Sequence, residues 1–563
     1  MSRKRTIFTA FLCFFSMILA LSACSVKESE TTALKKEDDK FEKLAEEKNK
    51  EFDLESIKLT TYSEEVGLKL KEPVYQKFAV NREVIVEGEI EKYSLLKSDY
   101  VWIKVYSNEG GPAGNQHEYY APIQDGKFKQ AIHFFNGEGE YRVTVQLPST
   151  DVENYYYDTA IFEVYNVNPD IQRDISYTPF GQDAKLTLNL DSNYVETEEL
   201  FQLKGESGNL NDEDTILIRL VKDSESWQHP IPIKEGKFAY DVPLFYGEGL
   251  HKLEVLVPDK ERENYFQIAT TILIENKSKR VMKPIEHSNI YLERGVTLEY
   301  PLFGGEESDG TFRIKGSIDP KAEFASETTH IYITSKKGED EALDVIPVKD
   351  FKFDDSFYLR FGSGTYEVTV SVPEIKKENS DYFKYFGFAQ FEVESNALKD
   401  ERDLLPSRGV QSDAPQIQEL AKDLTKGKSS EREKAKAIYD YVAKNIGYDV
   451  KKYENDEFKW DDSALKTLEL KTGVCQDYAY LTIALLRASN IEARFVEGRA
   501  GGIWPGRHAW VEANIDGSCL TMDSTWGAGY LEDGEFVPKF NDAYFDPNME
   551  EFKKTHTRTG VAY

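Results

Sequence analysis

Three residues near the end of the chain, Cys475, His508 and Asp523, carry side chains that together could perform nucleophilic catalysis. A thiolate can attack a carbonyl carbon, an imidazole can take up and return a proton, and a carboxylate can orient the imidazole. Cys475 follows Gly473, which permits a tight turn, and precedes apolar residues at helical spacing. At a helix N-terminus the free backbone N–H groups and the helix dipole favour a thiolate and could bind an oxyanion. We therefore expect Cys475 to be a reactive thiol rather than a core residue.

His508 and Asp523 belong to a predicted β-hairpin. Residue types alternate around His508 as they do in a strand, and Asp516-Gly517 is a strong hairpin-turn signal. With these two residues at the centre of the turn, Trp510 pairs with Asp523, and the imidazole and the carboxylate share one face of the hairpin. The two side chains are then close enough for the hydrogen bond that orients a catalytic base. A chance set of Cys, His and Asp is common in a long chain, but a hairpin that aligns two of them is much rarer.

Cys519 offers an alternative role for Cys475, namely a disulfide. In the predicted hairpin Cys519 lies four residues before Asp523, which is roughly 13 Å along a strand. A helix start directed at His508 would then hold the two sulfur atoms too far apart to bond. The eight histidines are scattered, and no Cys/His cluster has the spacing of a zinc site. We therefore expect neither this disulfide nor a metal or other cofactor.

The beginning of the chain has the features of a bacterial lipoprotein leader. A short basic run precedes an apolar stretch over 7–20, which is too short for a comfortable membrane span. The sequence LSAC, which ends at Cys24, resembles a lipobox, in which cleavage before the cysteine accompanies its acylation. We therefore expect a signal peptide over 1–23 and lipidation of Cys24, which would anchor the protein on the extracellular face of a bacterial membrane. The alternative is an ordinary signal peptide with a chance cysteine.

The charge of the chain bears on its partners. The formal net charge of −30 argues against nucleic acid as a partner and against adhesion to anionic lipid headgroups. Residues 24–60 are rich in Lys, Glu and Asp and poor in aromatic residues. This composition predicts a charged tether that is partly helical at most.

The middle of the chain repeats one pattern three times, with Phe128, Phe238 and Phe353 at corresponding positions. Apolar residues recur at every second position, as in half-buried antiparallel strands. Short strands, Gly-rich turns and a repeat length of about one hundred residues predict one antiparallel, immunoglobulin-like β-sandwich per copy. The expected copies span 61–169, 170–279 and 280–398. Tandem sandwiches serve as spacers or as binding modules, and we favour spacers.

Helical periodicity begins after the third copy and predicts a mixed α/β domain over 399–563. Ser430 and Glu433 have the spacing of a capping box before an apolar stripe. Gly447 stands where the C-terminal cap of that helix is expected.

Three short motifs of this last domain, GVCQDYA, HAWVE and DSTW, resemble those of the transglutaminase-like superfamily, whose core is shared with papain-type cysteine enzymes. The resemblance implies an α+β catalytic domain in which Cys475 is the nucleophile. It assigns His508 as general base and acid, and Asp523 as the residue that orients the imidazole. The family often uses an upstream aromatic residue as an oxyanion donor, for which Tyr448 is the first candidate and Trp460 the second. A histidine is also common where His556 stands, and we expect it to be structural.

These features together predict a membrane-anchored, extracellular cysteine enzyme that transfers acyl groups through a thioester. The expected substrates are protein or peptide amides at the cell surface or wall. Hydrolysis, as in a protease or amidase, is favoured over cross-linking, although the motifs do not specify the second nucleophile. The alternative is a binding or scaffold lipoprotein whose catalytic fold no longer turns over. An intact set of Cys475, His508 and Asp523 argues against that alternative.

Overall fold

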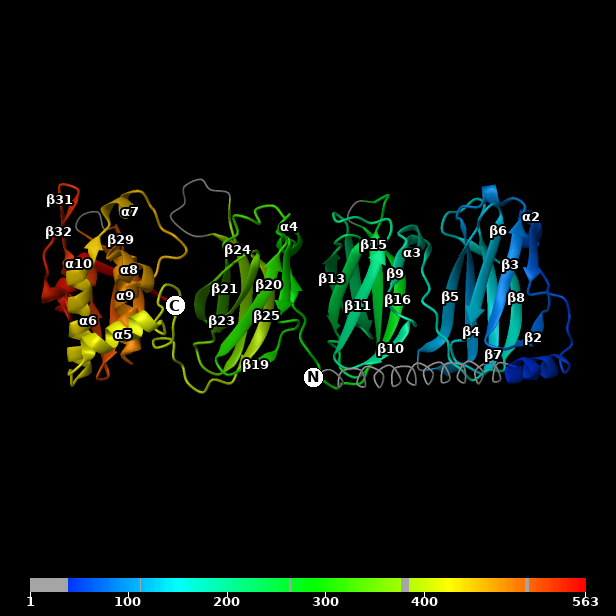
Figure 1. The fold of residues 1–563 in the computed structure, drawn as a ribbon, viewed down its shortest axis with the longest axis horizontal. Coiled ribbons are helices and arrows are strands. Elements are labelled where there is room, and N and C mark those ends of the chain that lie inside the picture. The colour runs from blue at the N-terminus through cyan, green and yellow to red at the C-terminus, as the bar shows by residue number, and fades with distance from the viewer. Residues whose placement is uncertain (1–38, 112, 263–264, 376–383, 502–505) are drawn as a thin grey trace, which may run out of the picture. The chain divides into compact units, whose positions relative to one another are not determined.

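The computed structural model describes residues 39–111, 113–262, 265–375, 384–501 and 506–563 (Figure 1). The predicted signal peptide and Cys24 lie outside these residues. The chain divides into two compact units, Met1–Val281 and Met282–Tyr563. None of the helices in the described ranges is both long enough and apolar enough to cross a membrane.

The expected β-sandwiches are present, and each has a smaller and a larger sheet (Figure 1). In the first, the smaller sheet runs β1 (Leu68–Glu72), β3 (Glu83–Ile90), β6 (Lys127–His133). Its larger sheet runs β2 (Lys77–Val80), β8 (Tyr156–Asn166), β7 (Gly139–Pro148), β4 (Tyr100–Gly111), β5 (Gly114–Pro122). Helix α2 (Thr61–Val66) and the short helix η1 (Tyr93–Leu95) complete this sandwich.

The second sandwich repeats this order. Its smaller sheet runs β14 (Lys237–Pro243), β11 (Leu200–Ser207), β9 (Leu186–Leu188). Its larger sheet runs β10 (Tyr194–Thr197), β16 (Phe266–Asn276), β15 (Gly249–Pro258), β12 (Thr215–Lys222), β13 (Glu225–Pro232). Helix α3 (Pro179–Asp183) precedes them.

The third sandwich has the same order with one added strand. Its smaller sheet runs β18 (Val296–Tyr300), β20 (Thr311–Ile318), β23 (Lys352–Tyr358). Its larger sheet runs β17 (Glu286–His287), β25 (Tyr385–Ser395), β24 (Gly364–Pro373), β21 (His330–Lys337), β22 (Asp340–Pro347), and β19 (Glu306–Ser308) also pairs with β25. Helix α4 (Ile290–Glu293) lies before β18.

The three copies also share local irregularities. The strand pairs β2–β8, β10–β16 and β19–β25 are parallel, whereas their neighbours are antiparallel. Each copy has a register shift in the pair β7–β8, β15–β16 or β24–β25, which bends the strands locally. The alternating buried residues of both sheets form the core of each sandwich, as in the first copy, where Val143 and Val145 are fully buried.

The end of the predicted tether is part of the first unit's fold. Residues 39–49 are helical, and Ala45 packs with Ala79 and Val167 of the first sandwich. The Asn49 side-chain amide donates to the Ala79 carbonyl oxygen at 2.8 Å and its oxygen accepts from the Ala79 N–H. This segment is therefore packed against the sandwich rather than extended away from it, because its few apolar residues fall on one helical face.

The C-terminal domain is α+β. Its central four-stranded antiparallel sheet runs β30 (Ser518–Met522), β29 (Gly506–Ile515), β28 (Ala493–Ala500), β33 (His556–Ala562). Its helices are α5 (Pro415–Thr425), α6 (Glu431–Asn445), α7 (Val450–Glu454), α8 (Ala464–Leu470), α9 (Cys475–Ala488), α10 (Ser524–Ala528), η2 (Asp542–Tyr544) and α11 (Met549–Thr555). Two short ladders, β26 (Gly447–Tyr448) with β27 (Thr472–Gly473) and β31 (Gly529–Glu532) with β32 (Glu535–Pro538), lie outside that sheet. Helix α9 is buried along most of its length and packs against β28 and β29.

The predicted helix over the apolar stripe is α6, and its start is as expected while its end differs. The Ser430 hydroxyl accepts from the Glu433 N–H and the Glu433 carboxylate accepts from the Ser430 N–H, which confirms the capping box. Gly447 is not the C-terminal cap. The helix ends at Asn445 with an extended Ile446, and Gly447 instead pairs with Thr472 in the parallel ladder β26–β27. The glycine is therefore used to begin a strand rather than to reverse the chain.

The third sandwich is joined to the C-terminal domain within the second unit. The buried guanidinium of Arg360 makes two hydrogen bonds to Asp344 and a third to the carbonyl oxygen of Pro406, which lies in the segment leading into the C-terminal domain. The Leu343 N–H donates to the carbonyl oxygen of Tyr563 at 3.0 Å, so the last residue of the chain contacts the same sandwich. These bonds attach the C-terminal domain to this one copy.

Candidate active site

Cys475 is the first residue of α9, as the sequence predicts, and it is half-buried. The preceding turn is fixed by Asp477, whose carboxylate accepts from the Val474 N–H at 2.8 Å. A Cβ atom at Gly473 would lie 2.5 Å from the Cβ atom of Asp477, so only glycine allows this close approach. The thiol therefore stands at a rigid helix start, with the free N–H groups of the first turn beside it.

The hairpin that carries the other two residues has the predicted register. Ile515 pairs with Ser518 across the Asp516–Gly517 turn, and Val511 pairs with Met522. Asp523 directly follows β30 and is the N-cap of α10, and its carboxylate lies 2.7 Å from Nε2 of His508 on β29. The expected imidazole–carboxylate contact is confirmed.

The carboxylate of Asp523 is completely buried and accepts four hydrogen bonds. Its Oδ1 accepts from the backbone N–H groups of Thr525 and Trp526, at 2.9 and 3.1 Å. Its Oδ2 accepts hydrogen bonds from Nε2 of His508 and, at 3.1 Å, from Nε2 of His556. Burial alone would raise the pKa of Asp523, but the two histidines outweigh it and hold that pKa well below its ordinary value. The site therefore contains a fixed negative charge whose hydrogen bonds all come from protein groups.

His508 links this charge to the thiol. Its Nε2 is directed at Asp523, and its side chain also hydrogen-bonds Cys475, which leaves Nδ1 for the sulfur. Burial opposes protonation, but the Asp523 charge and the hydrogen bonds to Asp523 and Cys475 prevail and raise the pKa of His508 to about 10. The three predicted residues are thus brought together as a continuous Cys–His–Asp chain of hydrogen bonds, which can move a proton between sulfur and substrate.

His556, expected to be structural, lies at the end of α11 where β33 begins, and it is buried. Its ring stacks on Phe552 at 3.8 Å between centroids, and its Nδ1 lies 2.9 Å from the Thr555 hydroxyl. This packing directs Nε2 at Asp523. The contact could not be found from spacing, because His556 is 33 residues from Asp523 in the chain.

The side chains of His508, Asp523 and His556 are close enough together for metal binding on spacing alone. Both imidazoles, however, direct a nitrogen at the same oxygen of one carboxylate, which is the arrangement of donors around a buried anion. We therefore assign no metal or cofactor to these residues.

The two aromatic candidates for an oxyanion donor are placed differently. Tyr448 pairs with Gly473 in the ladder just before Cys475, and burial together with the negative charge of Cys475 raises the pKa of its phenol far above the ordinary value. A phenol that keeps its proton can donate to an oxyanion. Trp460 instead stacks on His330 of the third sandwich, with ring centroids 4.4 Å apart, so the geometry favours Tyr448.

Cys519 takes no part in this arrangement. It lies on β30 opposite Asn514 and is exposed, and both it and Cys475 are free thiols. Burial raises the pKa of Cys519, with Glu512 adding to the effect. The disulfide alternative for Cys475 is therefore wrong for this structure.

Comparison with known proteins places this domain. Residues 418–526 match the profile of the transglutaminase-like superfamily. Kyphoscoliosis peptidase of Mus musculus is 27% identical over 155 residues, which cover 25% of this chain and 23% of that protein. UPF0252 protein MJ1282 of Methanocaldococcus jannaschii is 35% identical over 120 residues, which cover 20% of this chain and 28% of that protein. The chain therefore spans less than a third of the length of either relative.

A solved structure from Cytophaga hutchinsonii, named as a candidate cysteine protease, is 16% identical. The alignment covers 64% of this chain and 90% of that chain, with a TM-score of 0.21. The C-terminal domain is transglutaminase-like, and its site has the composition of a cysteine acyl-transfer enzyme.

Proposed function

We propose that the protein is a cysteine acyl-transfer enzyme that acts on amides of proteins or wall peptides at the bacterial cell surface. The observation that supports this most directly is the hydrogen-bonded series Cys475–His508–Asp523 at the start of α9. A purely structural role would not require a thiol at a helix N-terminus beside an imidazole that is held by a buried carboxylate.

The geometry suggests the following reaction. The Cys475 thiolate attacks the carbonyl carbon of the amide while the protonated His508 stands beside it. The proton on His508 passes to the leaving amine as the carbon–nitrogen bond breaks, and a thioester remains on the sulfur. His508 then takes a proton from water, whose oxygen attacks the thioester carbon. The carbon–sulfur bond breaks, which releases the carboxylic acid and restores the Cys475 thiolate beside the protonated His508. Asp523 remains ionised throughout and stabilises the imidazolium.

Tyr448 and the backbone N–H groups at the start of α9 would stabilise the oxyanion of each tetrahedral intermediate. Loss of one such donor typically costs about 10²- to 10³-fold in turnover. Hydrolysis is favoured over cross-linking because water needs no second binding site, whereas an acceptor amine does. An amine that reaches the thioester first would give the cross-linked product from the same intermediate.

The lipid anchor is part of the proposal and rests on the sequence LSAC. Acylated Cys24 would hold the protein at the outer face of the membrane, and the sandwiches would act as spacers. Changing Cys24 to Ala should abolish lipoprotein-type cleavage and acylation and leave the precursor in the membrane fraction. Normal maturation of this variant would show an ordinary signal peptide and remove the anchor.

The function itself can be tested without knowing the substrate. A thiol-directed activity probe should label wild-type protein at Cys475, and proteomics of surface peptides should show new products that are missing in Cys475→Ala cells. Released peptides with new carboxyl groups would indicate hydrolysis, and branched peptides would indicate cross-linking. Labelling at Cys475 with no change in any surface peptide would favour the alternative, a binding or scaffold lipoprotein.

A further inference from the structure

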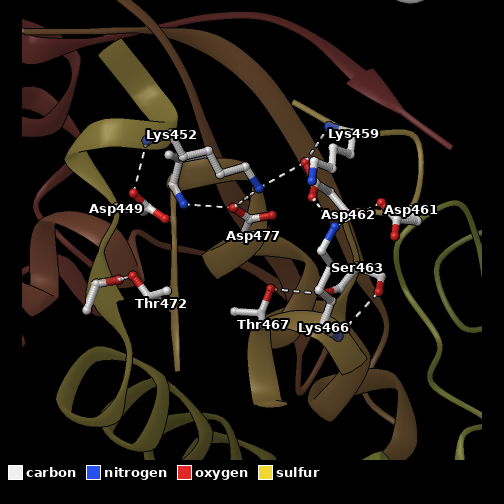
Figure 2. Close-up of polar contacts among 12 residues, drawn as sticks. Asp449, Lys452, Lys459, Asp461, Asp462, Ser463, Lys466, Thr467, Thr472 and Asp477 are labelled. Atoms are coloured by element: carbon white, nitrogen blue, oxygen red, sulfur yellow. Dashed lines mark hydrogen bonds and ion pairs between the residues drawn. The ribbon is translucent and has the colours of Figure 1, made fainter. Parts of the chain in front are cut away.

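A buried cluster of opposite charges lies beside the start of α9 (Figure 2). The ammonium of Lys452 on α7 lies between two carboxylates, 2.7 Å from Asp477 and 2.9 Å from Asp462. The side chains are only 14%, 4% and 3% exposed, so the ion pairs are shielded from solvent. Charges in such surroundings interact much more strongly than at a surface.

The two carboxylates differ in how many partners they have. Asp462 also accepts from the Lys459 N–H at 2.9 Å and lies 3.1 Å from the ammonium of Lys466. Asp477 accepts from the Val474 N–H, and the cation paired with it in the described part of the chain is Lys452. Loss of the Lys452 charge would therefore leave Asp462 with a second lysine but Asp477 with an uncompensated charge.

Asp477 has two opposite effects on the nucleophile. Its bond to the Val474 N–H holds the turn that presents Cys475, the residue next in the chain. Its negative charge in the first turn of α9, however, repels a thiolate two residues away. This repulsion opposes the stabilisation of the thiolate by the helix dipole. Burial raises the pKa of Asp477, and the ion pair with Lys452 acts against that rise.

The fold attaches Lys452 to the same turn. Helix α7 follows β26 directly, and β26 pairs with β27, the two residues that precede Val474. The Asp449 N–H donates to the Gly473 carbonyl oxygen at 2.9 Å, and the Asp449 carboxylate caps α7 by accepting from the Lys452 N–H. The lysine and the nucleophile are thus presented by neighbouring strands of one small ladder.

We propose that Lys452 is a positioning residue that neutralises Asp477, so that Asp477 can hold the turn before Cys475 without lowering the reactivity of the thiol. Among the residues that the structure describes, His508 from β29 and Tyr448 from β26 also interact with Cys475. Neither changes in the variants below. The proposal rests on the proposed function only in taking Cys475 as the reactive thiol.

The test is the pH dependence of iodoacetamide labelling at Cys475 in the full-length protein, measured by mass spectrometry. Lys452→Met should move the midpoint of the pH–rate profile upward by about one pH unit, so that labelling below the midpoint slows about tenfold. Asp477→Asn, which keeps an oxygen for the Val474 N–H, should move the midpoint downward. The double variant should return close to wild type, because both charges are gone.

Two further variants separate charge from structure. Lys452→Arg keeps the positive charge and should keep the wild-type profile. Lys466→Met removes a lysine of the same cluster that contacts Asp461 and Asp462 but not Asp477, and it should also leave the profile unchanged. If Lys452 acted in folding alone, Lys452→Met would lower stability, but the labelling midpoints of Lys452→Met and Asp477→Asn would not shift in opposite directions.

Three outcomes would overturn the inference. An unchanged or upward midpoint in Asp477→Asn does so even if Lys452→Met fails to fold. A double variant as slow as Lys452→Met, or an equal shift in Lys466→Met, does so as well. Failure of the proposed function looks different, since wild-type Cys475 would then be labelled no faster than Cys519.

Discussion

In the first sandwich the buried Tyr141 hydroxyl donates to the Gly137 carbonyl oxygen at 2.9 Å, and in the C-terminal domain the buried Asp523 carboxylate accepts four bonds. The tyrosine bond is neutral and local, and it recurs in the third copy as Tyr366 to Gly362. The Asp523 bonds come from three separate elements and surround a full charge. The tyrosine bond closes a turn of the repeat, whereas the Asp523 bonds hold an ionised group in place.

The third sandwich lies between these two cases. Phe135 and Phe245 are buried at corresponding positions of the first two copies, seven residues after the aligned phenylalanines, and Arg360 stands there in the third. Arg360 is fully buried and paired with Asp344. One copy of an otherwise apolar core position has thus become a charged attachment point for the neighbouring domain.

The largest contrast should come from Cys475→Ala. Loss of the nucleophile should reduce turnover on the order of 10⁴-fold or more, with little change in stability because the site is only half-buried. The measurement is probe labelling together with thermal unfolding. Residual labelling at another cysteine with full activity would show that the nucleophile lies elsewhere.

Asp523→Asn should have the next largest effect. The amide keeps the volume but removes the charge that stabilises the imidazolium, so activity should fall on the order of 10- to 10³-fold in a folded protein. His556→Gln, which keeps a donor near Asp523, should cost less. Equal activity of Asp523→Asn and wild type, with the same labelling profile, would contradict the role of the carboxylate.

The pH dependence of stability should differ in sign between the regions. The pKa of His508 is raised to about 10, so its contribution to stability is complete below its ordinary value of 6.5 and is lost as pH rises through about 10. The pKa of His330 in the third sandwich is lowered by burial to about 4, so its contribution is present above 6.5 and is lost as pH falls through about 4. The measurement is the free energy of unfolding of wild type, His508→Gln and His330→Gln across pH 4 to 10. The difference between wild type and each variant should change with pH in opposite directions, and a change in the same direction would contradict the prediction.

Arg360→Phe gives the third copy the phenylalanine that the other two copies have at this position. It leaves Asp344, which is mostly buried, without its partner and should lower the free energy of unfolding of the second unit by about 3 kcal/mol. Arg313→Met breaks a pair with Asp354 of similar two-bond geometry on the surface of the same sandwich and should cost much less, because solvent screens exposed charges. Denaturant unfolding of both variants makes the comparison, and equal costs would contradict a special role for Arg360.

The smallest effect is expected from Tyr141→Phe. The hydroxyl also accepts from the Asn136 N–H at 3.1 Å, so its loss should cost the first sandwich about 1 to 2 kcal/mol. Cys475 labelling should not change, because the site lies in the other unit. Hydrogen exchange of the β7 amides reports the local cost. Altered Cys475 labelling would contradict this prediction, because it would mean that the first sandwich affects the active site.

The sequence by itself determined the period-two strands of the repeats, the α6 capping box and the position of Cys475 at a helix start, because these follow from local spacing and turn chemistry. It also determined the contact of His508 with Asp523, since an Asp-Gly turn fixes the register of a hairpin. Only the tertiary structure placed His556 on Asp523 and Lys452 on Asp477, because each pair joins elements that are distant in the chain. Gly447 is a case in which the local signal was misleading. The signal predicted a helix cap, but pairing with Thr472 places this residue in a strand. Local patterns fix local geometry, whereas the partner of a buried charge is chosen by which elements the fold packs together.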